Sequence, residues 1–343
     1  GSCLRSPRPR WFRKPSEGFA IWLTLQRLIR TTRAGGGLGM NRPGEVDQKV
    51  VEFAELVGAV DPITVVGGRT QWAVGGTPES GTREVQAPAG IWSHEPEEMT
   101  VRCGAGTTLG ELSEQLARYG QMVPFDMAAE ATVGGVLSVG HSGLRRLKYG
   151  HIRDLVLQIR HVDHSGQIVS SGGPTVKNVS GYDLCRLMVG SLGKFGCIAE
   201  VTLRCLPIPA VAKWFTGVLD PFEIFNRLYR PSAILWDGNR VWVCIEGVES
   251  DVNAQASLFD FEEVAGPPSL PSGGRLGVEP KDLRTYTQND EDKWLAEVGV
   301  GVVHSERPGP DRSINAVNRS LMKDLEKRLD PNNRLNPGRQ VLV

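Results

Sequence analysis

The sequence predicts a protein that mixes α-helices with β-strands and is large enough for more than one domain. The chain has 343 residues, 40% hydrophobic and 23% charged, a length sufficient for two hydrophobic cores. Residues 99–103 and 198–205 alternate apolar with polar side chains, as half-buried strands do. Residues 108–120 have the apolar spacing of a helix. Glycine clusters follow several of the expected strands, so the connections of this mixed fold are unusually rich in glycine.

The composition argues against several classes of protein. Lysine plus arginine and aspartate plus glutamate both number 39, so the formal net charge is zero, whereas nucleic-acid-binding domains usually carry a basic excess. The six cysteines are scattered without a CxxC pair, so we expect no iron–sulfur cluster or structural zinc site held by this chain alone. Cys103 and Cys205 lie in apolar runs and are expected to be buried thiols, which favours a reducing, cytoplasmic compartment.

The N-terminal segment differs from the rest of the chain. Residues 1–39 contain eight Lys/Arg and one acidic residue, Glu17, a composition similar to that of a transit peptide. The apolar core Phe19–Leu25 is too short to span a bilayer, and no other segment is long and apolar enough to do so. We interpret residues 1–40 as an extension upstream of the natural start, or as a fusion scar, and expect them to lie outside the fold.

The first expected elements are marked by caps and glycine stops. Residues 47–57 have helical spacing and end at a glycine, and the apolar run 63–66 predicts a short buried strand that enters a glycine turn. Residues 99–103 predict a half-buried strand. The clearest helix follows, because Thr108 and Glu111 have the spacing of a capping box.

Regular and glycine-rich stretches alternate in the next part of the chain. Residues 131–150 are rich in glycine and show no periodicity long enough to assign. Residues 155–169 predict a hairpin, and the apolar positions of 184–188 space like one face of a helix. The strand 198–205 is stopped by the proline-containing segment 206–209, where we place a domain boundary.

The C-terminal part has a different character. Residues 233–247 predict a hairpin around an Asp-Gly turn, 252–264 predict a helix, and the composition of 266–280 predicts a mobile loop. Residues 313–329 predict a helix, which the turn-rich tail 330–340 follows.

Glycine clusters at 67–76, 104–106 and 131–150 stand at the ends of expected strands. Consecutive backbone N–H groups there can form a nest for phosphate oxygens, and glycine permits close approach of the backbone to an anion. An ordinary tight turn explains a single Gly-Gly pair equally well. The chain has neither a GxGxxG sequence between a strand and a helix nor a Walker A sequence, so a dinucleotide would need a different scaffold.

The order of several motifs resembles a known family. The motifs are GGRTQW (67–72), CGAGTTLGEL (103–112), GQMVPFD (120–126), ATVGGVLSVGHSGLRRLKYGHIRDLVL (131–157), KNVSGYDLCRLMVGSLGKFGCIAEVTLRCLPIP (177–209) and DPNNRLNPGR (330–339). In this order they resemble the FAD-binding domain shared by vanillyl-alcohol oxidase and p-cresol methylhydroxylase. KNVSGYDL and GQMVPFD are most similar to the FAD-binding subunits of bacterial glycolate oxidases. The resemblance covers 45–210 and 313–340, and 213–310 carries no motif that we can match.

The resemblance implies an α+β fold in which two subdomains enclose FAD, completed by a small α+β cap. The domains expected from it are a basic extension (1–40), an FAD-binding domain (41–212), a small cap or substrate domain (213–310), and a C-terminal helix and tail that return to the FAD-binding domain (311–343).

The resemblance also implies which residues would contact the cofactor. Residues 67–71 would wrap the pyrophosphate, Ile198 would meet the adenine side, and the tail would bring Asn336 or Arg339 near the flavin. Arg69 could pair with a phosphate or point to solvent, and the tail could instead be a frayed terminus. Because the loop 67–72 has no histidine, we expect non-covalent FAD. The full set of expected contacts is Gly67, Gly68, Arg69, Thr70, Gln71, Gly104, Gly106, Thr107, Thr132, Gly134, Gly135, Ser142, Gly143, Gly150, Ile198, Asn336 and Arg339.

Catalytic residues are less well marked. Oxidation of a 2-hydroxy acid by a flavin needs a carboxylate anchor, a base and positive charge near the flavin N1. Lys177 and Tyr182 lie in a family motif but could equally be structural, and His304 is a lone histidine. The candidate positive groups are Lys177, Arg145, Arg146 and Arg339. No metal is expected, and a hairpin position predicts exposed, unliganded side chains for His161 and His164.

The sequence therefore predicts an FAD-linked oxidoreductase, or a subunit of one, that acts on a CH–OH group of a 2-hydroxy acid such as glycolate or D-lactate. The short cap favours a chain that works with a second flavoprotein subunit and an iron–sulfur subunit, in the cytoplasm or at the membrane through those partners. Two alternatives remain open: an electron-relay or structural subunit with no substrate site, and a stand-alone flavin oxidase of a sugar or alcohol.

Overall fold

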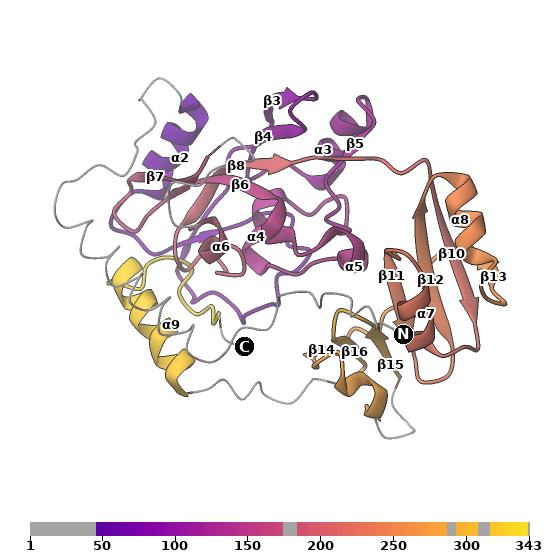
Figure 1. Ribbon diagram of the computed structural model, residues 1–343. Helices are drawn as coiled ribbons and strands as arrows, with labels where there is room; N and C mark the ends of the chain where they lie inside the picture. The colour runs from indigo at the N-terminus through magenta and orange to yellow at the C-terminus, as the bar shows by residue number, and fades with distance from the viewer. Residues whose placement is uncertain (1–45, 174–183, 287–292, 308–315, 342–343) are drawn as a thin grey trace, which may run out of the picture. The chain divides into compact units, whose positions relative to one another are not determined.

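The computed structural model describes residues 46–173, 184–286, 293–307 and 316–341 (Figure 1). The expected extension 1–40 lies outside the described residues, and so do Lys177 and Tyr182.

An antiparallel sheet of five strands forms the centre of the first half of the chain. Its strand β8 (Cys197–Arg204) pairs with β4 (Thr100–Gly104) on one side and with β6 (Val156–Val162) on the other. The strand predicted at 198–205 is thereby confirmed. Both faces of β8 are buried, since Val201 and Glu200 are 0% and 1% exposed. Residues on both faces of β4 are buried as well, so the half-buried expectation for 99–103 is wrong. The strands in order are β3 (Ile91–Glu95), β4 (Thr100–Gly104), β8 (Cys197–Arg204), β6 (Val156–Val162) and β7 (Ile168–Gly172).

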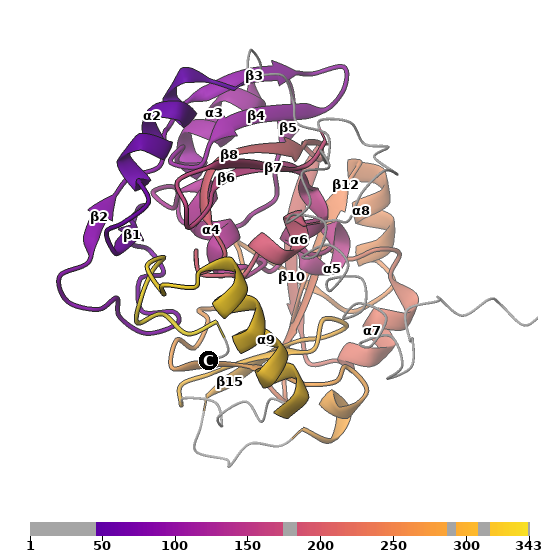
Figure 2. The same ribbon diagram turned by 90° about the vertical axis from the view of Figure 1, so that its left-hand side faces the viewer.

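Helices cover both faces of this sheet. Helix α2 (Gln48–Val57) contacts β7 and β8 from one side, and α4 (Val133–Val139) and α6 (Cys185–Met188) contact β8 and β6 from the other (Figure 2). Two helices begin with side-chain caps, of which the capping box of Thr108 and Glu111 was predicted. Asp47 accepts from the Lys49 N–H at 2.9 Å, and α3 (Leu109–Ala117) begins with the capping box of Thr108 and Glu111. Local hydrogen bonds thus fix the helix starts that the sequence marked.

Two helices in 131–150 have no counterpart in the prediction. Helix α4 begins where the Thr132 hydroxyl accepts from the Gly135 N–H at 3.2 Å, and the short helix α5 (Arg146–Tyr149) is followed by the 3-10 helix η2 (Ile152–Leu155). Two glycines near the start of α4 hide its periodicity. Gly134 is needed because a Cβ there would lie only 2.8 Å from the Ala105 Cβ.

The C-terminal tail pairs with the first strand of the fold. Strand β1 (Ile63–Val65) runs parallel to β2 (Arg83–Val85). The Ile63 N–H donates to the Arg334 carbonyl, and the Asn336 N–H donates to the Ile63 carbonyl, both at 2.8 Å. A further two-stranded pair is formed by β5 (Gln121–Met122) and β9 (Leu206–Pro207). Hydrogen bonds on both sides of β1 make the tail part of the fold rather than a frayed terminus.

Arg334 fixes the tail from within. Its side chain is 1% exposed and donates to the backbone carbonyls of Val57 (2.6 Å), His164 (3.0 Å) and Asp61 (3.1 Å). The guanidinium thereby joins the end of α2, the entry to β1 and the turn between β6 and β7. Helix α9 (Ala316–Leu329) precedes the tail and buries Leu325.

The second large sheet has seven strands, all antiparallel to their neighbours. Helices α7 (Pro221–Arg227) and α8 (Glu249–Ala256) pack against it around a core that includes Ile224, Val243 and Val252. A 3-10 helix, η3 (Asp282–Thr285), follows its edge strand β14. The strands in order are β13 (Glu262–Val264), β10 (Val211–Gly217), β12 (Val241–Gly247), β11 (Ala233–Trp236), β15 (Trp294–Glu297), β16 (Val302–Ser305) and β14 (Gly274–Gly277).

Both edges of this sheet differ from the prediction. The hairpin 233–247 is confirmed as β11 and β12, but the expected helix 252–264 ends at residue 256 and continues into strand β13. The expected loop 266–280 contains β14, which pairs with β16. Each edge strand is specified by a partner far away in the sequence, which local patterning does not report.

Within the described residues, no helix combines the length and the apolar character needed to cross a bilayer.

Candidate functional site

A glycine-rich cavity lies where the loops after β1 and β4 meet the start of α4, the segment 192–198 and the tail. Twelve of the expected contact residues line it. They are Gly67, Gly68, Arg69, Thr70, Gln71, Gly106, Thr132, Gly134, Gly135, Ile198, Asn336 and Arg339.

The loop after β1 presents a row of unused hydrogen-bond donors to this cavity. In the described part of the chain, the backbone N–H groups of residues 67–71 donate to no protein acceptor, and residues 67–70 are exposed. Arg69 has a φ of 55°, which curls the loop. Successive N–H groups in such a curved segment form an anion-binding concavity. The arrangement therefore fits a diphosphate group.

Close backbone packing explains several glycines around the cavity. A Cβ at Gly67 would collide with the Thr132 side chain, and one at Gly68 with the Glu130 carbonyl. Gly135 differs, because a Cβ there meets only the Thr132 hydroxyl, at 3.0 Å, and the residue is exposed. A larger side chain at Gly135 would therefore extend into the space of the cavity.

Arg69 and Arg339 both stack on Trp72. The Arg69 guanidinium lies 4.7 Å from the ring centroid and pairs with Glu84 at 2.7 Å, and its side chain is 50% exposed. A contact between Arg69 and a phosphate stays a prediction. The Arg339 guanidinium lies 4.5 Å from the same ring, and its Nη1 donates to the backbone carbonyls of Trp72, Gly76 and Val74 (2.7 Å). Arg339 thus holds the turn that follows the donor loop.

Asn336 joins β1 to the segment after α6. Its Oδ1 accepts from the Val65 N–H at 3.2 Å and its Nδ2 donates to the Leu192 carbonyl at 2.7 Å. A Cβ at Gly193 would collide with this Nδ2, so the glycine makes room for the amide. The placement of Asn336 and Arg339 in the lining agrees with the expected return of the tail, and their proximity to the flavin stays a prediction.

Five expected contact residues lie outside the lining of this cavity. The Thr107 hydroxyl donates to the Gly90 carbonyl at 3.1 Å, and the Ser142 hydroxyl accepts from the Ile152 N–H at 3.2 Å. Each of these residues shapes a neighbouring segment rather than the wall. The five are Gly104, Thr107, Ser142, Gly143 and Gly150.

A second cavity shares part of its wall with the first. Val74, Val139 and Leu192 line both. The charged lining of the second cavity comes from two distant parts of the chain, α5 with Arg146 and β14 with Arg275. Its histidines are His141 and His151. Sequence reasoning named Arg146 as one of four positive groups but missed Arg275, because it treated 266–280 as a loop.

The hydrogen bonding of His151 defines its tautomer. Its Nδ1 accepts from the Arg153 N–H at 3.2 Å, so the proton of the neutral ring is on Nε2. Burial, together with the nearby Arg146 and Arg153, lowers the pKa of His151 to about 4. His151 is therefore neutral at pH 7 and can donate one hydrogen bond.

His304 lies behind this second cavity rather than in its lining. It is the register partner of Arg275 across β14 and β16. Its Nε2 lies 2.8 Å from Glu297 Oε1, and the Arg275 Nη2 lies 3.6 Å from the same oxygen. Glu297 is 2% exposed, so the sequence candidate His304 belongs to a buried ion cluster that supports Arg275.

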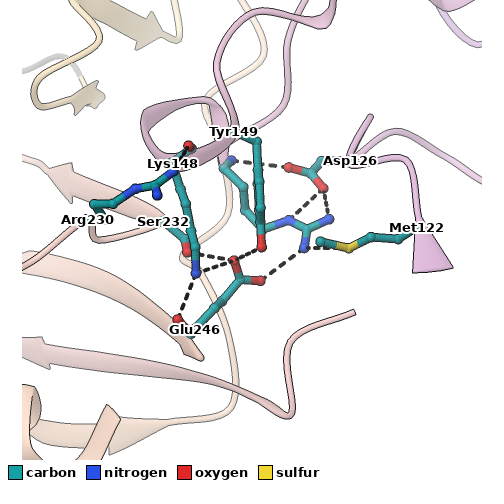
Figure 3. A network of polar contacts seen from close by, with 8 residues as sticks. Met122, Asp126, Lys148, Tyr149, Arg230, Ser232 and Glu246 are labelled. Carbon is teal, nitrogen blue, oxygen red and sulfur yellow. Dashed lines mark hydrogen bonds and ion pairs between the residues drawn. The ribbon is translucent and has the colours of Figure 1, made fainter. Parts of the chain in front are cut away.

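A network of polar contacts attaches α5 to the seven-stranded sheet (Figure 3). Arg145 bonds to Asp126 through Nε at 2.8 Å and to Glu246 of β12 through Nη1 at 3.0 Å. The Glu246 carboxylate also accepts from Tyr149 (2.8 Å) and Ser232 (2.6 Å). These bonds converge on one buried carboxylate, which is 1% exposed.

The ionisation of Glu246 follows from those contacts. Burial alone would raise the pKa of Glu246, but hydrogen bonds from Ser232, Tyr149 and Arg145 outweigh it and the pKa is lowered. Burial and the bond to Glu246 raise the pKa of Tyr149. Lys148 adds a 2.7 Å bond to the Glu246 backbone carbonyl. The network is therefore ionic at neutral pH.

Other histidines and the cysteines have structural environments. His161 is 8% exposed, so the expectation of an exposed side chain is wrong, and burial lowers its pKa to about 4. The described residues contain no group of three His, Cys, Asp or Glu side chains arranged for a metal ion. Their five cysteines are buried free thiols, and burial raises the pKa of Cys103 and Cys205 to about 12.

The fold and the cavity define an FAD-binding domain of the vanillyl-alcohol oxidase and p-cresol methylhydroxylase type. Residues 35–172 match the family model of the FAD binding domain, in agreement with the fold and the cavity. The solved structure of an alkyldihydroxyacetonephosphate synthase has the same fold, with a TM-score of 0.61 at 15% identity over 83% of this chain and 74% of that one.

Among individual proteins, the chain is similar to the glycolate oxidase subunit GlcE of Escherichia coli. The two are 33% identical over 215 residues, which cover 60% of this chain and 61% of that subunit. A D-lactate dehydrogenase of Anaerostipes hadrus is 33% identical over 251 residues, 69% of this chain and 51% of the dehydrogenase. The chain thus spans between half and two thirds of the length of these relatives.

Proposed function

We propose that this chain is an FAD-dependent oxidoreductase, or a subunit of one, that oxidises a small 2-hydroxy acid such as glycolate or D-lactate. The observation that carries the proposal is the shared wall of the two cavities, formed by Val74, Val139 and Leu192. A cofactor in the first cavity would border a second cavity lined by arginine and histidine, the side chains that suit a substrate carboxylate.

The first cavity suits non-covalent FAD. The free N–H groups of 67–71 would hold the diphosphate, and the α4 start at Thr132–Gly135 would present backbone beside it. The loop 67–72 offers no histidine for covalent attachment. Relatives named for glycolate and D-lactate oxidation support a flavin that works on a CH–OH group.

The second cavity would bind and deprotonate the substrate. Oxidation of a 2-hydroxy acid removes a proton from the hydroxyl oxygen and a hydride from the carbon that bears this hydroxyl. FAD would supply the hydride acceptor when bound. Since the His151 Nε2 already carries a proton, His151 would donate to a substrate oxygen. His141, which also lines the cavity, is the candidate base for the hydroxyl proton.

Partner subunits are part of this proposal. The relative GlcE is by its name one subunit of a glycolate oxidase. We infer that the chain works with a second flavoprotein subunit and an iron–sulfur subunit in the cytoplasm, reaching the membrane only through those partners. Buried free thiols in the described residues are compatible with a reducing compartment.

An anaerobic reduction assay tests the proposal. The chain is reconstituted with FAD and mixed without oxygen with glycolate, D-lactate, L-lactate, D-2-hydroxyglutarate, glucose or benzyl alcohol. We expect the absorbance of oxidised flavin to bleach with glycolate or D-lactate. Bleaching with glucose or benzyl alcohol alone would show that the substrate is a sugar or an alcohol rather than a 2-hydroxy acid. No bleaching with any of these compounds would favour an electron-relay subunit.

A further inference from the structure

The charged side chains that line the second cavity are positive. Its lining includes the side chains of Arg146 and Arg275 and, within the described part of the chain, no aspartate or glutamate. Two cations on one wall repel each other, and the proximity of Arg275 helps burial to lower the pKa of Arg146. A cavity of this kind is stabilised when an anion enters it.

Arg146 lacks the partners that its neighbours have. In the described residues its guanidinium makes no hydrogen bond and no ion pair, although the residue is half-buried. The adjacent Arg145 pairs with two carboxylates, and Lys148, two residues after Arg146, donates to the Glu246 carbonyl. A half-buried arginine usually finds a carboxylate or carbonyl acceptor, so the five donors of Arg146 point to a partner outside the chain.

Arg275 is only partly compensated. Its Nη2 lies 3.6 Å from Glu297 Oε1, an oxygen that His304 also contacts at 2.8 Å, and 3.5 Å from the Ser142 carbonyl. The negative charge of Glu297 offsets the positive charge of Arg275, so Arg146 carries the positive charge of the wall that is not offset. One negative charge on the ligand would therefore balance the cavity.

We propose that Arg146, with Arg275 beside it, anchors the single carboxylate of a small monoanionic substrate in the second cavity. This inference rests on the proposed function. The anchor comes from α5 and the supporting cation from β14. The neutral His151 would add its Nε2–H to a second oxygen of the same ligand.

The position of the anchor depends on the network beneath it. Helix α5 has a single turn, Arg146–Tyr149, too short to be stable alone. Tyr149, Lys148 and the preceding Arg145 all bond to Glu246. Glu246 is thus a positioning residue that fixes the direction of Arg146.

The test compares two probes that differ in the carboxylate. Oxamate is a monoanionic analogue of a 2-hydroxy acid that cannot be oxidised at that position, and oxamide is its neutral counterpart. Each is titrated into the FAD-loaded full chain while the flavin absorbance is recorded at constant ionic strength. We expect a saturable spectral change with oxamate and none with oxamide.

Variants assign the site. Arg146→Gln should raise the Kd for oxamate about 10- to 100-fold, the loss of a charge-assisted hydrogen bond, and Arg146→Lys should lie between it and the parent chain. Arg118→Gln, the same charge change at the exposed C-cap residue of α3, which pairs with Glu114, should leave the Kd unchanged. FAD content and the thermal midpoint, measured for every variant, show that each one is folded.

The outcomes separate the anchor from the reaction. Unchanged oxamate affinity in Arg146→Gln, or equal binding of oxamide and oxamate, would overturn the anchor. If D-lactate also bleaches Arg146→Gln with the parent KM, the anchor fails and the oxidation stands. Oxamate binding that depends on Arg146, without bleaching by any hydroxy acid, would keep the anion site and refute the oxidation.

Discussion

The Arg145 guanidinium and the Glu246 carboxylate lie 3.0 Å apart, and this contact joins residues 101 positions apart in the sequence. It attaches the segment that carries Arg146 of the second cavity to strand β12 of the seven-stranded sheet. A substitution of either residue should therefore alter both the free energy of unfolding and the geometry of the second cavity.

Glu246→Gln should destabilise the fold in a pH-dependent way. Loss of hydrogen bonds to a charged group costs about 2 kcal/mol at neutral pH. The pKa of Glu246 is lowered in the folded chain, so its stabilisation is complete above the unfolded value of about 4.3. It is lost as pH falls through the folded pKa.

Urea unfolding at pH 7 and at pH values near and below 4 measures this difference. The gap between parent and variant should be widest at pH 7 and shrink in acid. Glu223→Gln is the control, because it removes an exposed carboxylate paired with Arg227 and should cost at most about 0.5 kcal/mol. A gap that is constant with pH would contradict the ionic role of Glu246.

Gly135→Val should abolish FAD retention while leaving most of the fold. Within the described residues, a Cβ at this position lies 3.0 Å from the Thr132 hydroxyl and meets no other side chain, so the rest of the valine would enter the cavity. FAD per chain after gel filtration measures retention, and circular dichroism reports the fold. Gly110→Val is matched, since it places the same side chain on α3 in contact with Ala129 at 3.4 Å. Full flavin content in Gly135→Val would show that the cofactor lies elsewhere.

Arg334→Met should be strongly destabilising. The substitution keeps an apolar stem but leaves the carbonyls of Val57, Asp61 and His164 without their donor. Each unpaired buried group costs about 1–3 kcal/mol, so we expect a loss of at least about 3 kcal/mol in the free energy of unfolding, followed by urea denaturation. Arg328→Met, at an exposed position near the end of α9, should change stability by less than about 0.5 kcal/mol.

The tail should also matter for the cofactor. Arg339→Gln removes the guanidinium that holds the carbonyls of Trp72, Val74 and Gly76, and the donor loop beside them should bind FAD more weakly. Truncation after Asp330 should weaken FAD binding or lower the flavin potential as well, but it also removes Arg334. Unchanged flavin content, potential and thermal midpoint in both proteins would show that the tail does not serve the cofactor.

The sequence predicted the elements that are specified locally. The capping box at Thr108 and the Asp-Gly turn at 237–238 lie within a few residues of everything they determine, so α3 and the β11–β12 hairpin were recognisable. The glycines of the cavity were recognisable through the resemblance, because their order along the chain is a motif.

What sequence reasoning missed depends on distant partners. Strand β14 exists through its pairing with β16, and with it Arg275 enters the wall of the second cavity. Nothing in the local sequence distinguishes Glu246 from other polar residues of the hairpin, and its contact with Arg145 is formed by the tertiary fold. Buried polar groups at such positions satisfy tertiary contacts that have no local signature.

The pairing of β1 with the tail has a consequence for how the protein is made. Val65 and Asn336 are hydrogen-bonded across 271 residues, and parallel or long-range pairing forms late because the chain between must first be closed into a loop. During translation, the donor loop 67–71 leaves the ribosome long before the clamp residues Arg334 and Arg339 exist. The nascent chain therefore carries the donor loop without its tail contacts until residues 334–339 have been made. We therefore expect flavin insertion to follow the pairing of β1 with residues 334–336.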